Sequence, residues 1–404
     1  MESPTRRAAL AVGVAVLLVT AGCLGGTNPS DGSTSSTPDS TDDTAESCTY
    51  NASTAAATET GTWSPNASVD QYPQGVAGNG TLSNASVLAN AHFDETANRS
   101  TGFSVDWEDP NKDFVRRIVS GPDPSTYYST FDGTTSGSDT PKTERLYVTG
   151  SQHYLQFTGE NETLYQVGQN TSYHGSAWTR DDTFGPQSSL ERFLARGNYT
   201  VNGTVERDGR TFVQLTATEG SPPWTRDSFV TYDGTALVTP EGVVHEVEES
   251  FGTGTNGTIE KRYEGSVTLD TDVEWCGSPS WTTDVSHLSL SIVEDGHAVE
   301  IRNTGGTALP ANTTFSVAGH DEPVVKHRIH PSSDRSGTVT TDARLEPGDI
   351  VYVTASVDGS AASFALHESP TRGEYAFGAA SVTGGNETVH YRLLTGVTTP
   401  EWEE

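Results

Sequence analysis

Three cysteines carry the clearest chemistry in this 404-residue sequence. Cys23 follows Ala21-Gly22, at the end of a segment in which Arg6-Arg7 precedes an apolar stretch. This order is typical of a lipoprotein signal peptide, where the cysteine after small residues receives a lipid. We therefore predict that residues 1–22 are a signal peptide and that Cys23 is the lipidated N-terminus of the mature chain.

The apolar stretch also suggests where the protein resides. It covers about 12 residues, whereas a membrane-spanning helix needs roughly 20, so a permanent transmembrane helix is the less favoured alternative. The pair Arg6-Arg7 resembles a twin-arginine export signal, which carries folded proteins across the membrane. We expect the mature chain on the extracellular face of the cytoplasmic membrane, held there by the lipid on Cys23.

Cys48 and Cys276 remain once Cys23 is lipidated. In an exported protein such a pair favours a disulfide, because the compartment is oxidising. The bridge would connect residues close to the N-terminus with the far end of the first folded region. The alternative is two separate thiols.

Asn-X-Ser/Thr sequons are frequent along the chain. In an exported protein they predict glycosylation at the surface. The alternative is chance, because a sequence rich in Thr, Ser and Asn generates sequons automatically. We expect Asn161 and Asn256 to be the most accessible, since both lie in turns. The sequons begin at Asn51, Asn66, Asn79, Asn84, Asn98, Asn161, Asn170, Asn198, Asn202, Asn256, Asn312 and Asn386.

Motifs that would indicate an enzyme do not fit their surroundings. Residues 252–257 match G-x-G-x-x-G, but the next residues alternate like a strand where a dinucleotide site needs a helix, which predicts a hairpin loop. His245 to Glu249 lacks the second histidine of a zinc-protease motif. The histidines after residue 284 have no cysteine among them to complete a copper site. We expect no catalytic residue, metal or cofactor.

The charge balance indicates the kind of solvent in which the protein works rather than a reaction or a ligand. There are 54 acidic residues against 23 basic ones, a formal net charge of -31, and only four of the basic residues are lysines. This excludes electrostatic nucleic-acid binding, which needs a basic surface. The composition is typical of halophilic archaea, whose molar salt screens self-repulsion. Residues 23–70, rich in Ser, Thr, Asp and Gly, predict a disordered tether.

Residues 71–275 predict an α+β domain of antiparallel strands with two helices. Residues 84–97 and 187–196 carry apolar positions at helical spacing, the first behind a Ser or Asn cap and the second ending before a glycine. Asp208-Gly209 predicts a hairpin turn, and Asp233-Gly234 a further turn. The remaining runs predict strands. These are residues 113–119, 126–131, 144–148, 153–157, 163–167, 199–205, 211–218, 243–251, 259–265 and 266–270.

Several of these segments carry a resemblance to uncharacterised haloarchaeal surface lipoproteins. They are Tyr72-Pro73 to Val76, the helix with Leu88, Ala91 and His92, the segment from Leu190 to Val205 with Asp208-Gly209, and the strand from Val243 to Val247. The order helix, meander, helix, meander also resembles the half-barrel of LolA-type lipoprotein carriers and of LppX- and LprG-like lipoproteins. That resemblance implies a curved antiparallel sheet that wraps helices and holds acyl chains, without establishing function.

An acyl-chain cavity needs a concave sheet face lined with apolar and aromatic side chains. Nine aromatic residues of the predicted strands are candidates for this lining. The alternative is that they simply form the core, and His92 is expected to be a hydrogen-bonded core histidine. The candidates are Tyr127, Phe131, Tyr147, Tyr154, Phe157, Tyr165, Phe212, Phe229 and Tyr232.

Residues 284–395 form a second predicted region. Short alternating runs with turn residues between them predict an immunoglobulin-like β-sandwich. The expected strands are residues 287–293, 298–303, 314–318, 324–329, 337–341, 350–357, 363–367, 374–380 and 389–393. The segment from Val299 to Gly306 loosely resembles surface sandwich modules of exported archaeal proteins.

The sequence as a whole predicts a mainly β, lipid-anchored surface protein without enzymatic activity. The leading hypothesis is a half-barrel that binds a lipid or another apolar small molecule, followed by a sandwich that presents it. The alternative is a structural or adhesive protein with a fully packed core that contacts other envelope proteins. The membrane is an expected partner through the lipid anchor, and nucleic acid is not.

Overall fold

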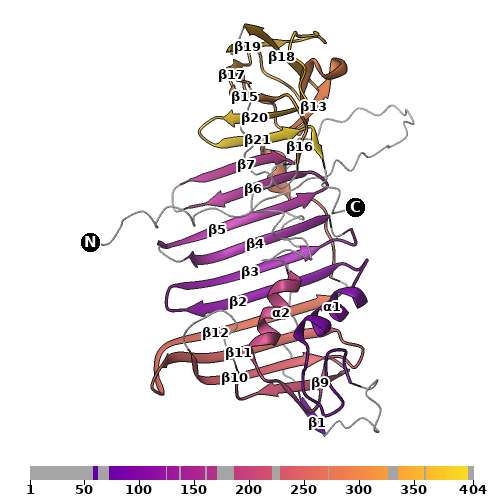
Figure 1. Ribbon diagram of the computed structural model, residues 1–404, viewed down its shortest axis with the longest axis vertical. Coiled ribbons are helices and arrows are strands. Elements are labelled where there is room, and N and C mark those ends of the chain that lie inside the picture. Colours follow the sequence, from indigo (N-terminus) through magenta and orange to yellow (C-terminus); the bar gives the residue numbers. More distant parts are fainter. Residues whose placement is uncertain are drawn as a thin grey trace, which may run out of the picture.

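The computed structural model describes residues 58–61, 72–123, 125–135, 138–159, 162–170, 186–220, 228–271, 273–325, 335–358 and 361–398. The predicted signal peptide, Cys23, Cys48, Asn161 and most of the predicted tether lie outside these residues. The described part is mainly β with two α-helices, as predicted (Figure 1). Within it, no helix has the length and apolar character that a membrane crossing requires.

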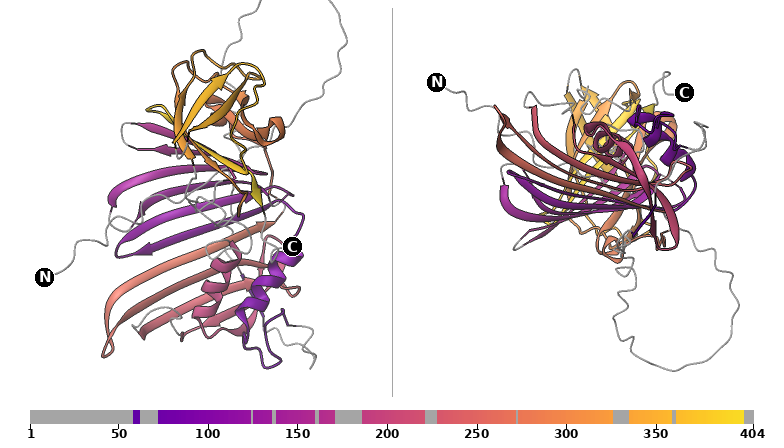
Figure 2. Two further views of the ribbon diagram at one scale, coloured as in Figure 1. Left: turned by 45° about the horizontal axis from the view of Figure 1, so that its top comes forward. Right: turned by 90° about the horizontal axis from the view of Figure 1, so that it is seen from below.

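One 16-stranded sheet runs through most of the protein. It is curved and does not close on itself, which confirms the predicted half-barrel architecture (Figure 2). Its first twelve strands pair antiparallel throughout. In spatial order these are β1 (Thr58–Gly61), β8 (Thr200–Arg207), β9 (Arg210–Ala217), β10 (Ser228–Val238), β11 (Val244–Thr255), β12 (Thr258–Thr271), β2 (Thr101–Asp109), β3 (Lys112–Ser120), β4 (Thr126–Thr135), β5 (Ser138–Thr149), β6 (Gln152–Thr158) and β7 (Thr163–Gln169).

The same sheet continues into the C-terminal region without a break. Strand β7 pairs in parallel with β21 (Val389–Thr395), from Tyr165 opposite Val389 to Gln169 opposite Leu393. Beyond β21 follow β20 (Ala379–Gly385), β15 (Thr314–His320) and β17 (Arg335–Thr340). Strand β7, the last of the antiparallel strands, is therefore paired on both sides and leaves no exposed sheet edge there.

A second sheet packs against these last strands. It contains β13 (Ser286–Val293), β14 (Ala298–Gly306), β18 (Ile350–Asp358) and β19 (Ala361–His367). Gln169 of β7 fixes its position, because its side chain accepts from the Leu290 amide at 2.6 Å and donates to the Leu290 carbonyl at 3.2 Å. One hydrophobic cluster includes residues from both parts of the chain, such as Leu88 and Leu393.

Both predicted helices are confirmed. Helix α1 (Ala85–Glu95) starts at Asn84, whose side chain accepts from the Val87 amide at 3.1 Å. Helix α2 (Pro186–Arg196) buries Leu190, Phe193 and Leu194, whose spacing places them on one side of the helix. The helices contact each other and lie against one face of the large sheet, which we call the helix face (Figures 1 and 2).

Glycines in this sheet serve two different purposes. Asp208-Gly209 and Asn256-Gly257 adopt positive φ and turn the β8–β9 and β11–β12 hairpins, as tight hairpin turns require. The predicted turn at Asp233-Gly234 is wrong, because both residues lie within the continuous strand β10. A Cβ on Gly234 would approach the Tyr199 hydroxyl to 2.7 Å, so this glycine makes room for a ring.

One strand prediction in the C-terminal region is also wrong, and another is described only in part. Of the predicted strand at 324–329 the structure describes residues 324–325, which form β16 (Val324–Val325) and pair with β22 (Val397–Thr398); the remaining residues lie outside the described part of the chain. In the predicted strand at 374–380, only Ala379 and Ala380 belong to a strand, β20. Tyr375 and Phe377 before it are buried, and the Phe377 amide donates to the Gly296 carbonyl instead of to a neighbouring strand. The two predicted strands at 259–265 and 266–270 are instead the single strand β12.

Candidate functional site

The strand register divides the nine predicted cavity residues between two faces. Residues paired across antiparallel strands project to the same face. Trp107 and Gly265 are paired, and the Trp107 ring contacts Phe193 of α2 at 5.9 Å, so this pair marks the helix face. The register then places Tyr127, Phe131, Phe157, Phe229 and Tyr232 on the helix face, and Tyr147, Tyr154, Tyr165 and Phe212 on the opposite face.

The prediction that all nine line one cavity is therefore wrong for the four residues of the opposite face. Phe212 packs with Val205 and Leu237 in a small separate cluster. The other three contact rings from the segment that enters the second sheet: Tyr147 stacks on Trp275 at 6.2 Å, Tyr165 on Trp281 at 6.3 Å, and Tyr154 meets His287 at 4.7 Å. These contacts have a structural role.

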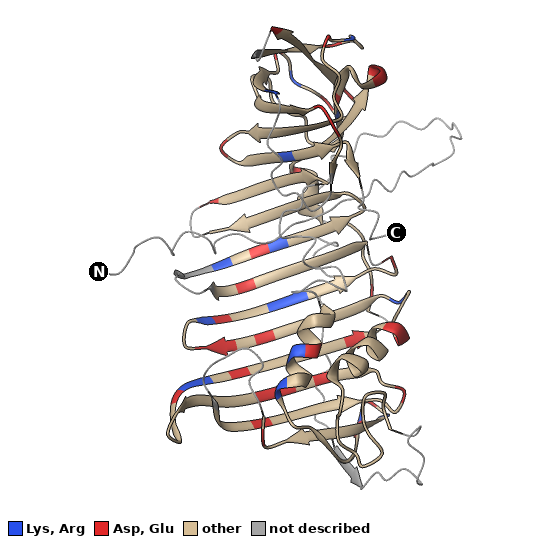
Figure 3. Cartoon of the chain, in the orientation of Figure 1, with Lys and Arg blue, Asp and Glu red and all other residues tan. Residues whose placement is uncertain are grey.

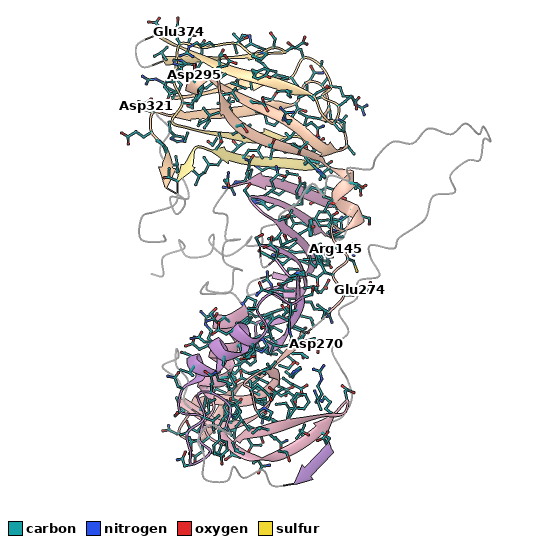
Figure 4. The ribbon with its side chains drawn as sticks, turned by 90° about the vertical axis from the view of Figure 1, so that its right-hand side faces the viewer. Arg145, Asp270, Glu274, Asp295, Asp321 and Glu374 are labelled. Atoms are coloured by element: carbon teal, nitrogen blue, oxygen red, sulfur yellow. The ribbon has the colours of Figure 1, made fainter. Side chains whose placement is uncertain are left out.

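The connecting segment from residue 273 to 285 runs along this opposite face. Its 3-10 helix η4 (Ser280–Asp284) carries Trp281. Figure 4 shows Asp270 and Glu274 on the side of the sheet away from the helices. Cys276 lies in the same segment and is disulfide-bonded. Its partner is outside the described residues, so its pairing with Cys48 remains a prediction.

A row of aromatic side chains crosses the helix face at the strand ends that lie away from α1. Phe251 stacks on Tyr263 at 4.7 Å, and both rings lie 6.2 Å from Trp107. Trp107 is paired with Phe114, whose ring stacks on Phe131 at 5.3 Å. Five neighbouring strands, β11, β12, β2, β3 and β4, thus present one continuous aromatic surface.

The apolar character of the helix face continues past the helices. Helices α1 and α2 lie over β11, β12, β2 and β3, whereas β4 to β7 extend beyond them (Figure 1). The register places a group of apolar side chains on the helix face of these four strands, which we call the apolar floor. It contains Phe131, Leu146, Leu155, Phe157 and Leu164; the first three are buried, Phe157 is half-buried and Leu164 is 37% exposed.

Five buried polar side chains lie on the helix face of β3 to β7. Arg116 on β3, Ser129 on β4 and Glu144 on β5, which we call the polar triad, are each at most 9% exposed. The other two, His153 on β6 and Gln166 on β7, lie 3.4 Å apart. Burial lowers the pKa of Arg116 to about 9, and it raises the pKa of Glu144. The two charges attract each other and oppose these shifts. Burying a charged group costs free energy unless the group is paired and hydrogen-bonded.

A second buried polar network connects α2 to the sheet. Arg196, the last residue of α2, forms an ion pair with Glu249 of β11. The Tyr232 hydroxyl donates to the other Glu249 oxygen at 3.0 Å and lies 3.2 Å from the Tyr199 hydroxyl. Burial raises the pKa of Glu249 to about 7, while Arg196 and Tyr232 act in the opposite direction. The Arg196 guanidinium also lies 4.9 Å from the centre of the Trp107 ring.

The opposite face of the same strands is hollowed and acidic. A hollow of about 490 Å³ is lined by carboxylates of Asp106, Glu108, Asp233, Glu248 and Glu264. Figure 3 shows acidic residues on each of the strands β2, β10, β11 and β12. Within the described residues, no group of three or more His, Cys, Asp or Glu side chains is arranged to hold a metal ion. The hollow fits the general acidity of the chain.

Several of these residues were missed by the sequence analysis. Strand β2 was not predicted, although Phe103, Val105 and Trp107 alternate as strand residues do. Arg116 occupies an apolar phase of β3, between Phe114 and Ile118, and such an interruption is the available signal. Glu249 gave no signal, because it is one of many carboxylates in the chain.

His92 and Asn256 lie where the sequence placed them. His92 is buried and its Nδ1 accepts from the Val244 amide at 3.1 Å, so it is a hydrogen-bonded core residue. Asn256 is exposed at the tip of the β11–β12 hairpin. Residues 252–255 belong to β11, so the G-x-G-x-x-G segment is a strand end and its turn.

Comparisons with known proteins give little additional information. No protein-family model matches the chain, and no curated protein does. Among solved structures, MucB in complex with MucA(peri) is similar at 11% identity with a TM-score of 0.19, covering 71% of this chain and 94% of that one. The Pseudomonas aeruginosa MucA/MucB complex is similar at 11% identity and a TM-score of 0.19, covering 70% and 92%.

Proposed function

We propose that the protein is a lipid-anchored, non-enzymatic surface protein that binds a lipid or another apolar small molecule on its helix face. The observation that carries this proposal is the apolar floor. Phe131, Leu146, Leu155, Phe157 and Leu164 extend the apolar face over β4 to β7, beyond the strands under α1 and α2. The floor is buried at Phe131, Leu146 and Leu155 and partly exposed at Phe157 and Leu164, so the contact with an apolar molecule is proposed at its β6–β7 end.

The sequence supplies the cellular setting of this proposal. A lipid on Cys23 holds the protein at the outer face of the membrane of a halophilic archaeon. Such an anchor is needed because the formal charge of -31 excludes electrostatic attraction of the chain as a whole to an anionic lipid surface. The tether of residues 23–70 then keeps the half-barrel within reach of membrane lipids. The C-terminal sandwich presents the loaded half-barrel to other components of the envelope.

A structural role is the second candidate, and one observation favours it. The parallel pairing of β7 with β21 and the stacking of Trp275 on Tyr147 fix the C-terminal region to the half-barrel. A continuous sheet of this length resists bending between its two parts. In that case the floor is permanently packed and the protein contacts other envelope proteins through its surface.

Displacement of a fluorescent fatty acid from the delipidated full-length protein distinguishes the two candidates. Phe157→Ala removes a partly exposed ring of the floor, and Phe212→Ala removes a ring of the opposite face as the matched control. Ligand binding predicts weaker affinity for Phe157→Ala alone. Absence of binding by the wild-type protein would leave the structural role.

A further inference from the structure

The lysines of this chain gather at one end of the large sheet. Only four lysines occur in 404 residues. Lys112 of β3, Lys142 of β5 and Lys261 of β12 lie toward the strand ends away from α1, and the fourth, Lys326, is outside the described residues. The hairpins β11–β12, β2–β3, β4–β5 and β6–β7 all turn at this end. Figure 3 shows basic residues near the left-hand ends of β12, β3 and β5.

The strand register places all three lysines on the helix face. Residues two apart in a strand share a face, so Lys261 shares that of Tyr263, and Lys112 that of Phe114. Lys142 lies level with Phe114 through two successive pairings. Lys112 lies two residues nearer to its turn than this level, and Lys261 two residues nearer again. The lysines therefore form one diagonal row, with neighbours two strands, about 10 Å, apart across the sheet.

This row carries the exposed charge of its part of the helix face. Lys261 is exposed, Lys142 is half-buried, and the side chain of Lys112 is 40% exposed although it lies 3.5 Å from Asp109. The carboxylates that the register places beside the row, Asp109 and Glu144, have buried side chains. The acidic hollow lies on the opposite face of the sheet. A chain of net charge -31 thus presents ammonium groups here.

The exposed end of the apolar floor lies at the same end of the sheet. Phe157 is opposite Glu144, two residues inside Lys142, and it is half-buried. Leu164 is opposite Phe157 and is 37% exposed. Exposed ammonium groups and an exposed apolar side chain therefore lie along one border of the helix face. We call this set the hairpin rim: Lys112, Lys142, Lys261, Phe157 and Leu164.

We propose that the hairpin rim docks on an anionic lipid surface, with its lysines on lipid phosphates and Leu164 among the apolar parts of the head-group region. This inference goes beyond the proposed function, because the contact does not require a ligand on the apolar floor. Lysine side chains keep their charge in the water layer while apolar side chains beside them enter the lipid. The predicted lipid on Cys23 brings the rim within reach of such a surface.

The net charge of the chain does not oppose this contact in molar salt. At that salt concentration the Debye length is about 3 Å, so carboxylates on the far side of the sheet are screened from the lipid. A lysine that touches a phosphate is closer than this length and keeps its attraction. An acidic protein surface would also complement the lysines, but it offers no apolar layer for Leu164. The combination therefore favours a lipid surface.

Flotation with phosphatidylglycerol vesicles in molar NaCl tests the inference. The protein is the mature chain, residues 23–404, with Cys23→Ser so that no lipid anchor contributes to binding. The test variant combines Lys112→Gln with Lys261→Gln. The matched control combines Arg117→Gln with Arg262→Gln, which removes the same charge from exposed positions on the opposite face of the same two strands.

Two further variants separate charge from apolar contact. Lys112→Arg combined with Lys261→Arg keeps both charges, and Leu164→Ser removes the apolar side chain alone. Phosphatidylcholine vesicles, which carry no net charge, serve as the second surface. Thermal melting verifies that each variant is folded.

We expect the two lysine-to-glutamine changes to lower affinity for phosphatidylglycerol vesicles about 5- to 30-fold, as loss of two surface lysines does. The arginine control and the lysine-to-arginine variant stay close to wild type. Leu164→Ser lowers the affinity about 2- to 10-fold, because its apolar area no longer leaves water. Phosphatidylcholine vesicles bind weakly and do not distinguish the charge variants.

Three results would overturn the inference. Equal losses for the lysine variant and the arginine control indicate a general charge effect without a role for the rim. Self-association that appears without vesicles and is lost in the lysine variant identifies a second copy of the chain as the partner. Absence of binding to phosphatidylglycerol vesicles removes the docking surface, whereas the proposed function is tested separately by fatty-acid displacement and stands if that displacement occurs.

Discussion

Arg196 and Glu249 form an ion pair between the last turn of α2 and the middle of β11, and it holds the helix to the sheet. The Glu249 side chain is fully buried, and that of Arg196 is 14% exposed. Removing one partner of such a pair leaves the other buried without compensation, which costs about 3–5 kcal/mol. The position of α2 over the helix face therefore depends on this contact.

Replacing Arg196 should destabilise the protein by an amount close to that cost. We expect Arg196→Met to lower the free energy of unfolding by about 3 kcal/mol, because the Glu249 carboxylate loses its cation. Arg192→Met is the control, since it lies on the same helix one turn earlier and is only partly buried. Urea denaturation in molar salt measures both variants. Equal stability of the two would contradict the role of the pair.

The same carboxyl predicts a pH dependence. Burial raises the pKa of Glu249 to about 7, above its usual value of 4.5, so the folded state holds this proton more tightly than the unfolded state. This tighter binding of the proton stabilises the folded state fully below about pH 4.5, and the stabilisation is lost as the pH rises to about 7. Glu249→Gln should flatten this part of the stability profile, measured by denaturation at several pH values. Glu264→Gln, on the exposed side of β12, should leave it unchanged.

Gly265 is expected to tolerate no side chain. A Cβ at this position would lie 2.7 Å from the Trp107 ring and 3.0 Å from that of Phe193. Gly265→Ala should therefore cost about 1–3 kcal/mol, as overpacking does. Gly159→Ala is the control, because its nearest neighbour would be 3.9 Å away. A lower melting temperature for Gly159→Ala than for Gly265→Ala would show that the helix face can accommodate a side chain at position 265.

These positions show what the sequence could and could not predict. The caps and spacings of α1 and α2 are local, so both helices were predicted, and so was the hairpin at Asp208-Gly209. The faces of the strands depend on pairing between distant segments, so Tyr147 and Tyr127 could not be separated in advance. The Asp-Gly pair at Asp233-Gly234 was predicted as a turn. The true role of Gly234 could not be predicted, because the ring that needs its space, Tyr199, comes from a distant part of the sequence.

The disulfide of Cys276 gives a further prediction. Cys276 is bonded, and Cys48 is its predicted partner. Peptide mapping of the unreduced protein should therefore yield a linked pair of peptides containing these two residues. Cys276→Ser should lower stability by about 2–4 kcal/mol, because the bridge closes a long loop. Detection of two reactive thiols in the denatured, unreduced protein contradicts this pairing.

The acidity of the chain predicts a need for salt. With a net charge of -31, carboxylates crowd the surface and line the hollow of β2, β10, β11 and β12. Below roughly 0.5 M salt their repulsion is screened less effectively, so the melting temperature should fall. Melting curves over a series of NaCl concentrations measure this. A melting temperature that does not change in dilute buffer would contradict the prediction that the protein is halophilic.

The central claim is that the helix face binds an apolar ligand. Native mass spectrometry of the full-length protein, purified in high salt without delipidation and paired with lipid extraction, tests it most directly. The account predicts a stoichiometric apolar ligand on the wild-type protein and its loss from Phe157→Ala, with Phe212→Ala unaffected. A wild-type protein that carries no ligand and yields no extractable lipid beyond its own anchor would contradict the account.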